Sequence, residues 1–236
     1  MRNFGFLDYF RLAFQQSDYH YAIVGVMMLV GAVFSIMLHE VAHGFAAWKA
    51  GDPTAKYYGR MTLNPLKHFD LFGFACFVVI GFGWAKPVPV NDSNFRNYRK
   101  GLFWVAVSGV LTNLALAFVS VPLAELSWMW YYAAPNDFAF ALAYLFEGMW
   151  QVNLLFIVFN LLPIYPLDGF RVVEALGKGR FARRYKNFMY EYGSWVLLAV
   201  LIVIYALSFW PFNVSIFGTL ADWLGTPILW FWNLIF

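Results

Sequence analysis

The fold is decided by the stretch YAIVGVMMLVGAVFSIMLHEVAHGFAAW, which occupies residues 21–48. At 1.5 Å per residue, this run is long enough to cross the ~30 Å hydrocarbon core of a bilayer as one helix. Its only groups that titrate near neutral pH are His39, Glu40 and His43. Because a charged group at the centre of a membrane helix costs about 2.5–3.5 kcal/mol, this cluster indicates a functional site inside the helix.

The composition of the whole chain is that of a membrane protein. Of its 236 residues, 62% are hydrophobic and only 12% are charged, whereas soluble domains carry about a quarter charged residues. Several further runs are long and apolar enough to cross a bilayer. We therefore predict an all-α polytopic membrane protein with about five to six transmembrane helices. The single cysteine, Cys76, excludes a disulfide within the chain.

The apolar runs suggest where the membrane helices lie. We expect spans over residues 21–48, 102–126, 138–162 and 195–209. The tail over residues 212–236 is apolar but interrupted, so the sequence leaves open whether it spans the bilayer or lies at its interface. Near the amino terminus, apolar side chains at helical spacing predict an interfacial helix on the outer surface. They are Phe4, Phe6, Leu7, Phe10 and Phe14.

A shorter apolar run from Leu71 to Trp84 has basic residues on both sides. A single crossing would therefore violate the positive-inside rule. We interpret the run as a re-entrant segment, which must be covered by protein or water. The flanking stretches 56–64 and 86–91 are expected to be extended rather than helical, because the first is rich in strand-forming residues and the second alternates with proline.

The placement of the basic residues predicts the orientation of the chain. Of 16 Lys and Arg residues, 14 lie in the stretches 49–67, 86–100 and 171–186, and the segments 125–137 and 208–222 contain none. The basic stretches should therefore face the cytoplasm. Since topology accounts for these charges, a nucleic-acid partner is not expected.

The motif HEVAH has the spacing of a metal site. Its histidines are four residues apart, so they lie side by side about one helical turn apart and suit two adjacent vertices of a tetrahedral zinc ion. Glu40 projects from the next position, as the general base does in the H-E-x-x-H arrangement of zinc hydrolases. Gly31 and Ser35 precede His39 at intervals of four residues. This stripe of small residues predicts that the histidines face the helix bundle.

A catalytic zinc needs a third protein ligand and an open position. Asp168, in PLDG, is the best candidate, because Pro163 and Pro166 break the preceding helix near its cytoplasmic end. The alternative is that Asp168 is an ordinary turn aspartate before glycine. The remaining ligand candidates are Glu174, His68 and Asp70.

The chain resembles a known family in several motifs. HEVAH in the first long span, SGVLTN (108–113) and NLLPIYPLDG (160–169) resemble the motifs of the site-2 protease family of intramembrane zinc metalloproteases. The linking stretches GRMTLNPLKHFDLFG (59–73) and GWAKPVPVN (83–91) are similar to its compact prokaryotic branch, which lacks PDZ and CBS domains. The resemblance covers most of residues 20–192.

The resemblance implies roles for individual residues. It implies one Zn²⁺ per chain, held by His39, His43 and Asp168, with Glu40 as general base. It also implies that Asn160 is a polar group near the scissile carbonyl, for which an interhelical hydrogen bond is the alternative. We expect the small and polar residues of SGVLTN to pack their helix closely against the catalytic helix. They are Ser108, Gly109 and Asn113.

The resemblance further implies a single intramembrane metalloprotease domain over residues 1–236. Its parts are an interfacial helix (1–19), a catalytic core (20–192) and C-terminal membrane segments (193–236). The protein is expected to be a multi-pass protein of a prokaryotic plasma membrane, with its active site toward the cytoplasm. No PDZ-like or CBS-like domain is visible, so the membrane part itself or a partner should select the substrate.

The expected function is regulated intramembrane proteolysis. The partners would be a transmembrane protein or peptide substrate, the lipid bilayer and an accessory membrane protein. An unwound substrate could pair with the stretches 56–64 and 86–91 as an added strand. One alternative is another membrane-anchored zinc peptidase, in which Glu174 would be the third ligand. The other is a non-catalytic zinc-binding or transport protein, which would move metal without proteolysis.

Overall fold

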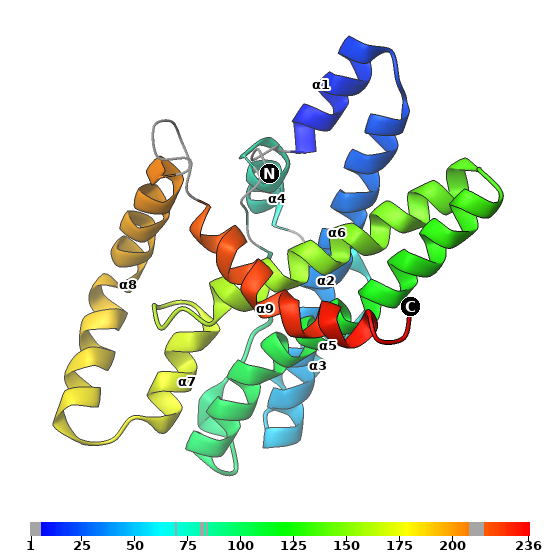
Figure 1. Cartoon of the computed structure of the whole chain (residues 1–236). Coiled ribbons are helices and arrows are strands. Elements are labelled where there is room, and N and C mark those ends of the chain that lie inside the picture. The colour runs from blue at the N-terminus through cyan, green and yellow to red at the C-terminus, as the bar shows by residue number, and fades with distance from the viewer. Residues whose placement is uncertain (1–5, 69, 81–82, 84, 208–214) are drawn as a thin grey trace.

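The computed structural model describes residues 6–68, 70–80, 83, 85–207 and 215–236 (Figure 1). Within these residues every regular element is helical, as the sequence predicted. The α-helices are α1 (Phe6–Gln16), α2 (His20–Ala50), α3 (Thr54–Tyr57), α4 (Leu71–Ile80), α5 (Tyr98–Ala133), α6 (Asp137–Asn160), α7 (Asp168–Leu176), α8 (Gly179–Leu207) and α9 (Ile216–Trp232). Short 3₁₀ turns, η1 (Pro65–Lys67) and η2 (Asp92–Asn94), lie between them.

Four of the described helices are long and apolar enough to cross a membrane: α2, α5, α6 and α8. They contain the predicted spans 21–48 and 102–126 and most of 138–162 and 195–209, with α6 ending at Asn160. They confirm a polytopic all-α membrane protein. Helix α9 has 17 residues with Pro227 inside it, so at 1.5 Å per residue it is somewhat shorter than the hydrocarbon core. It packs along α6.

Helices α2, α5 and α6 pack against one another and form the centre of the molecule (Figure 1). Small residues allow the close approach. A Cβ added at Gly31 of α2 would lie 2.9 Å from Met149 of α6, and one added at Gly148 of α6 would lie 2.9 Å from Met28. Ser35 is fully buried in the same contact. The small-residue stripe of α2 therefore faces the bundle, as predicted.

The segment between α2 and α5 starts and ends at the same end of α2. Gly51 ends α2 with a positive φ of 116°, a conformation that glycine adopts without steric cost. The N–H of Arg96 then donates to the carbonyl of Ala50 at 3.0 Å, and the buried carboxylate of Asp52 accepts from the N–H of Asn91 at 2.7 Å. Between these ends, α4 reaches α1 near the opposite end of α2 (Figure 1). This is the topology expected of a re-entrant segment.

One of the two stretches expected to be extended is not. Lys56 and Tyr57 belong to α3, and Gly59 turns the chain with a φ of +62°. The expectation was wrong because Asp52 accepts hydrogen bonds from the N–H and hydroxyl of Thr54, which starts a helical turn that outweighs the strand preference of the tyrosines. The stretch 86–91 forms no helix, as its prolines predicted.

The basic stretch before the last predicted span is also more helical than expected. Helix α8 begins at Gly179, well before Trp195, and residues 208–209 of the predicted span lie outside the described part of the chain. Its first turns are rich in Arg, Lys and Ala, which favour helix. Helix α8 stands apart from the α2–α5–α6 bundle (Figure 1). Helix α1 forms as predicted, although Phe4 lies outside the described residues.

Candidate metal centre

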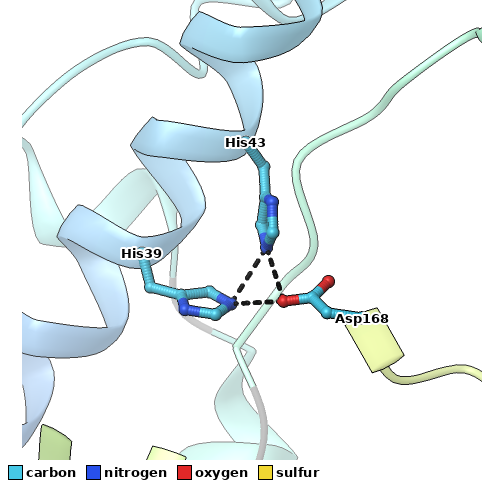
Figure 2. Close-up of side chains that lie close together, drawn as sticks. All are labelled: His39, His43 and Asp168. Atoms are coloured by element: carbon cyan, nitrogen blue, oxygen red, sulfur yellow. Dashed lines mark hydrogen bonds and ion pairs between the residues drawn. The ribbon is translucent and has the colours of Figure 1, made fainter. Parts of the chain in front are cut away.

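Three side chains converge from distant parts of the chain: His39 and His43 on α2, and Asp168 at the start of α7 (Figure 2). The Nε2 atoms of the histidines are 2.9 Å apart. Oδ2 of Asp168 lies 3.4 Å from Nε2 of His39 and 3.3 Å from Nε2 of His43. All three residues are buried. The sequence-predicted trio is therefore brought together in one compact group.

The spacing of these donor atoms fits a zinc ion. Bonds of about 2.0–2.2 Å in a tetrahedron place two ligand atoms roughly 3.3 Å apart, and the three measured separations lie close to that value. Two imidazole nitrogens and one carboxylate oxygen are also ligands that zinc accepts, and three protein ligands leave a fourth position open. The buried Oδ2 of Asp168 accepts no hydrogen bond, so a cation would satisfy it.

Helix α5 orients both histidines. Nδ1 of His43 lies 2.7 Å from the carbonyl of Val105. Because a carbonyl can only accept, Nδ1 carries the proton, and the lone pair of Nε2 points at Asp168. Nδ1 of His39 lies 3.3 Å from Oδ1 of Asn113, which has the same effect. Sequence reasoning assigned Asn113 to packing alone, but it also lies within hydrogen-bonding distance of a histidine of the trio.

Gly109 lets α5 approach the trio. A Cβ added at this position would lie 2.5 Å from Cε1 of His39, closer than real Cβ contacts come. Ser108, one residue earlier, lies 3.4 Å from Nδ1 of His43 and donates to the carbonyl of Val105 at 2.7 Å. The packing role predicted for the SGVLTN stretch is therefore confirmed for Gly109.

Asp168 owes its position to the turn between α6 and α7. Helix α6 ends at Asn160, and the turn that follows contains a cis Tyr165–Pro166 bond. Gly169 packs so closely there that an added Cβ would lie 2.3 Å from the carbonyl oxygen of Leu161, so only glycine fits. Asp168 is the first residue of α7. The PLDG motif therefore begins a helix and aims its carboxylate at α2.

Glu40 lies beside the trio but outside it. Its Oε2 accepts a hydrogen bond from the backbone N–H of Val88 at 2.9 Å. A Cβ added at Gly44 would lie 3.2 Å from Cγ1 of Val88, so α2 and the stretch 86–91 are in close contact here. Glu40 is half-buried. It is thus placed next to the candidate metal ligands, where a general base is needed.

Asn160 is not joined to the trio. It is the half-buried last residue of α6, and among the described residues no hydrogen bond or ion pair links it to His39, His43 or Asp168. The interhelical hydrogen bond considered for Asn160 is made instead by Asn153, whose Nδ2 donates to Oγ of Ser35 at 2.8 Å. Asn153 was missed, although an amide inside an apolar helix is itself a sign of such a contact.

The other ligand candidates are engaged elsewhere. Glu174 pairs with Lys186 at 2.5 Å, Nε2 of His68 lies 2.9 Å from the carbonyl of Thr62, and Asp70 accepts from the N–H of Gly73 at the start of α4. The trio is the only His, Cys, Asp or Glu group of three within the described residues whose donor atoms could share one metal ion.

Comparison with known proteins identifies the family of the chain. The family model "Peptidase family M50" matches residues 129–204, which contain Asp168. A Bacillus subtilis protein named "Putative zinc metalloprotease YwhC" is 42% identical over 149 residues, which cover 63% of this chain and 68% of the relative. The chain belongs to the M50, or site-2 protease, family. No solved structure gives a significant match.

Two further relatives have lower identity. "Putative zinc metalloprotease Rip2" of Mycolicibacterium smegmatis is 31% identical over 159 residues, covering 65% of this chain and 58% of the relative. The protein of the same name in Mycobacterium tuberculosis is 32% identical over 161 residues, which also cover 65% of this chain and 58% of the relative. The chain is thus an integral membrane member of a zinc metalloprotease family, with a buried His-His-Asp group that fits the metal.

Proposed function

We propose that this protein is an intramembrane zinc metalloprotease that hydrolyses peptide bonds of membrane-protein substrates. The observation that carries the proposal is the convergence of His39, His43 and Asp168 with spacings that suit one zinc ion, inside a bundle of apolar helices. Membership of the M50 family supports it. A site inside a bundle of membrane helices suits a substrate that is itself in the bilayer.

Each residue has a proposed role. His39, His43 and Asp168 hold the zinc ion, and Val105 and Asn113 orient the two imidazoles. When bound, zinc acts as a Lewis acid that lowers the pKa of water toward ~7 and polarises a carbonyl. Glu40 accepts a proton from the attacking water and donates it to the leaving amine. Asn160, at the end of α6, is proposed to donate a hydrogen bond to the scissile carbonyl.

The site is proposed to open toward the cytoplasm, near one end of the bundle. The C-terminal end of α2, the N-terminal end of α5 and the α7–α8 connection lie at the same end (Figure 1). Lys49, Lys100 and Lys178 belong to these three ends. A basic end is the cytoplasmic end under the positive-inside rule. This arrangement, together with the family, also supports a prokaryotic plasma membrane as the location.

The stretch 86–91 is the proposed guide for an unwound substrate, because Val88 contacts Glu40 directly. A substrate strand added there can pair with only some of the backbone groups of residues 86–91, because the others are absent or already engaged. Pro87 and Pro89 have no N–H, the N–H of Val88 is taken by Glu40, and Arg60 already donates to the carbonyls of Lys86 and Pro87. We therefore propose that the substrate pairs with backbone groups that these contacts leave free, such as the carbonyl of Pro89. The stretch 56–64 is not proposed as a partner, because it is not extended.

The test is Glu40→Gln, compared with Glu191→Gln on the exposed surface of α8. Both proteins are placed in liposomes with a transmembrane reporter peptide, and both are assayed for bound zinc. We expect the first variant to keep zinc but lose roughly 10²–10⁴-fold in cleavage rate, and the second to cleave normally. Substantial cleavage by the Glu40 variant would refute the mechanism. Zinc flux without cleavage by the wild type would favour a transport protein instead.

The same variant can identify substrates. If Glu40→Gln still binds substrate without cleaving it, membrane proteins should co-purify with it from cells more strongly than with the wild type. We expect these proteins to have a transmembrane segment that can unwind near its cytoplasmic end. Capture of soluble proteins alone would contradict an intramembrane substrate.

A further inference from the structure

A cavity separate from the metal centre lies between the start of α5, helix α7 and the first turns of α8. It has a volume of about 440 Å³. Four basic side chains line it: Arg99 from α5, Lys178 from the α7–α8 connection, and Arg183 and Lys186 from α8. None of the residues proposed to hold or serve zinc lines this cavity. It is therefore a second candidate binding site.

Glu174 is the one carboxylate in the cavity lining, and its negative charge is already balanced by Lys186. Its side chain is only 4% exposed and lies 2.5 Å from Nζ of Lys186. It also accepts hydrogen bonds of 2.9 Å from the hydroxyls of Tyr98 and Tyr190. Burial alone would raise the pKa of Glu174, but Lys186 and the two tyrosines lower it below its usual range. Glu174 is thus an ionised, fully partnered group.

The other three basic side chains remain available to bind an anion. Within the described residues, Arg99, Lys178 and Arg183 make no ion pair, and all three are exposed. They come from different elements, yet they line the same cavity. Several uncompensated cations around a concave site favour an anion, and guanidinium groups in particular suit phosphate oxygens.

Apolar side chains accompany the basic side chains here. Val173 lines it and is 37% exposed, and the neighbouring Leu176 and Phe181 are 62% and 83% exposed. Farther along α8, residues 192–207 carry no charged side chain, and Trp195 is 71% exposed. The basic cavity thus lies at the end of an apolar helix surface. A soluble phosphate compound has no apolar part to contact that surface, whereas the acyl chains of a lipid can pack against it.

We propose that this cavity binds the phosphate headgroup of an anionic phospholipid, with the acyl chains lying along α8. A basic pocket at the ends of membrane helices is a recognised way to hold such headgroups. Arg99, Lys178 and Arg183 contact the phosphate, and the Lys186–Glu174 pair forms the wall behind it. Helix α7 forms part of the cavity and also begins with Asp168, so the lipid would brace the helix that carries the third candidate zinc ligand.

The test uses phosphatidylglycerol and phosphatidylcholine as probes, with the full-length protein in nanodiscs and bound lipid measured by native mass spectrometry. Lys178→Gln/Arg183→Gln removes two charges from the cavity. Arg180→Gln/Arg184→Gln removes two charges from the first turns of α8 but outside the lining. We expect roughly a 30-fold loss of phosphatidylglycerol affinity in the cavity variant. The control variant should change less than about twofold, because only the cavity charges contact the lipid.

Three outcomes would overturn the proposal. Equal losses in the two double variants would show a diffuse charge effect rather than a site. Equal affinity of the wild type for the two lipids would show that the net negative charge of the headgroup is not recognised. Displacement of the lipid by millimolar inorganic phosphate or glycerol 3-phosphate would show a soluble anion site. If the cavity variant failed to fold by circular dichroism, the single variant Arg99→Gln would replace it, with Lys100→Gln, outside the lining, as its control.

Discussion

The backbone N–H of Val88 donates a hydrogen bond to Oε2 of Glu40 over 2.9 Å. This bond joins the re-entrant segment between α2 and α5 to α2, the helix that carries HEVAH. A hydrogen bond to an ionised group contributes more than one between neutral groups. The bond therefore fixes the direction of the Glu40 carboxylate, and it ties the proposed general base to the stretch proposed to guide the substrate.

The first prediction concerns this bond. Val88→Pro removes the donor while keeping an extended backbone, which proline tolerates. Because a hydrogen bond to a charged group contributes about 1.5–3 kcal/mol, we expect the cleavage rate to fall roughly 10- to 100-fold. Val88→Ala keeps the N–H and should stay close to wild type. Zinc content, measured in parallel, should be unchanged in both. Equal rates in the proline and alanine variants would show that the bond has no role.

The second prediction separates the two acidic candidates for the third zinc ligand. Asp168→Ala removes a donor atom from the trio, so we expect zinc affinity to fall by roughly 100-fold or more, beyond what loss of an outer partner costs. Glu174→Ala should leave zinc affinity unchanged, because Glu174 pairs with Lys186 instead. Metal content after dialysis against a graded chelator measures both. The reverse result would favour the alternative zinc peptidase in which Glu174 is the ligand.

The third prediction concerns the contact between α5 and His39. Gly109→Ala places a methyl group 2.5 Å from the His39 ring, so the ring must move away from its metal-binding position. We expect zinc affinity to fall roughly 10- to 100-fold, as for other changes that misorient a ligand. Leu111→Ala, at an exposed position of the same helix, is the matched control. A Gly109→Ala protein with normal zinc affinity would mean that α5 can shift without affecting the site.

Several features of the fold and site could be predicted because each depends on local chemistry. The four-residue spacing of His39 and His43 fixes their side-by-side placement on a helix, and the prolines before Asp168 force a break where they stand. The cost of polar groups in hydrocarbon then requires these groups to meet one another. The structure brings the trio together as predicted, although the ligand roles themselves stay predictions.

Other features depend on tertiary placement and could not be predicted. The hydrogen bond between Ser35 and Asn153 needs the register of α2 against α6, which the sequence does not specify. The stretch 56–64 became a turn because Asp52 organises its start. The basic cavity exists because α8 begins at Gly179, near the start of α5, whereas the membrane span was expected to begin only at residue 195. The Ser35–Asn153 bond and the cavity thus depend on contacts between distant elements, whereas the stretch 56–64 depends on a local hydrogen bond that strand propensity does not include.

The fourth prediction tests the polar contact between α2 and α6. Nδ2 of Asn153 donates to Oγ of Ser35 at 2.8 Å, and both residues are fully buried. We expect Ser35→Ala and Asn153→Ala to be non-additive, with a coupling energy of about 0.6 kcal/mol, the average for interhelical hydrogen bonds in membranes. Unfolding in mixed micelles measures the double-mutant cycle. Strict additivity would show that the two residues act independently.

The fifth prediction concerns Asp52, which closes the segment between α2 and α5. Its buried carboxylate accepts from Asn91 and from Nδ2 of Asn94, each at 2.7 Å, and also from Thr54. Burial would raise the pKa of Asp52, but these hydrogen bonds, led by that from Thr54, lower it below its usual value. The unfolded state therefore takes up a proton at a higher pH than the folded state does.

The contribution of Asp52 to stability is fully present above its unfolded pKa of about 3.9 and is lost as the pH falls through its lower folded pKa. We expect Asp52→Asn to reduce thermal stability at pH 6, with the difference from wild type shrinking below pH ~4. Asp222→Asn, at an exposed position on α9, should show no such trend. A difference that grew toward low pH would mean that Asp52 does not stabilise the fold through its charge.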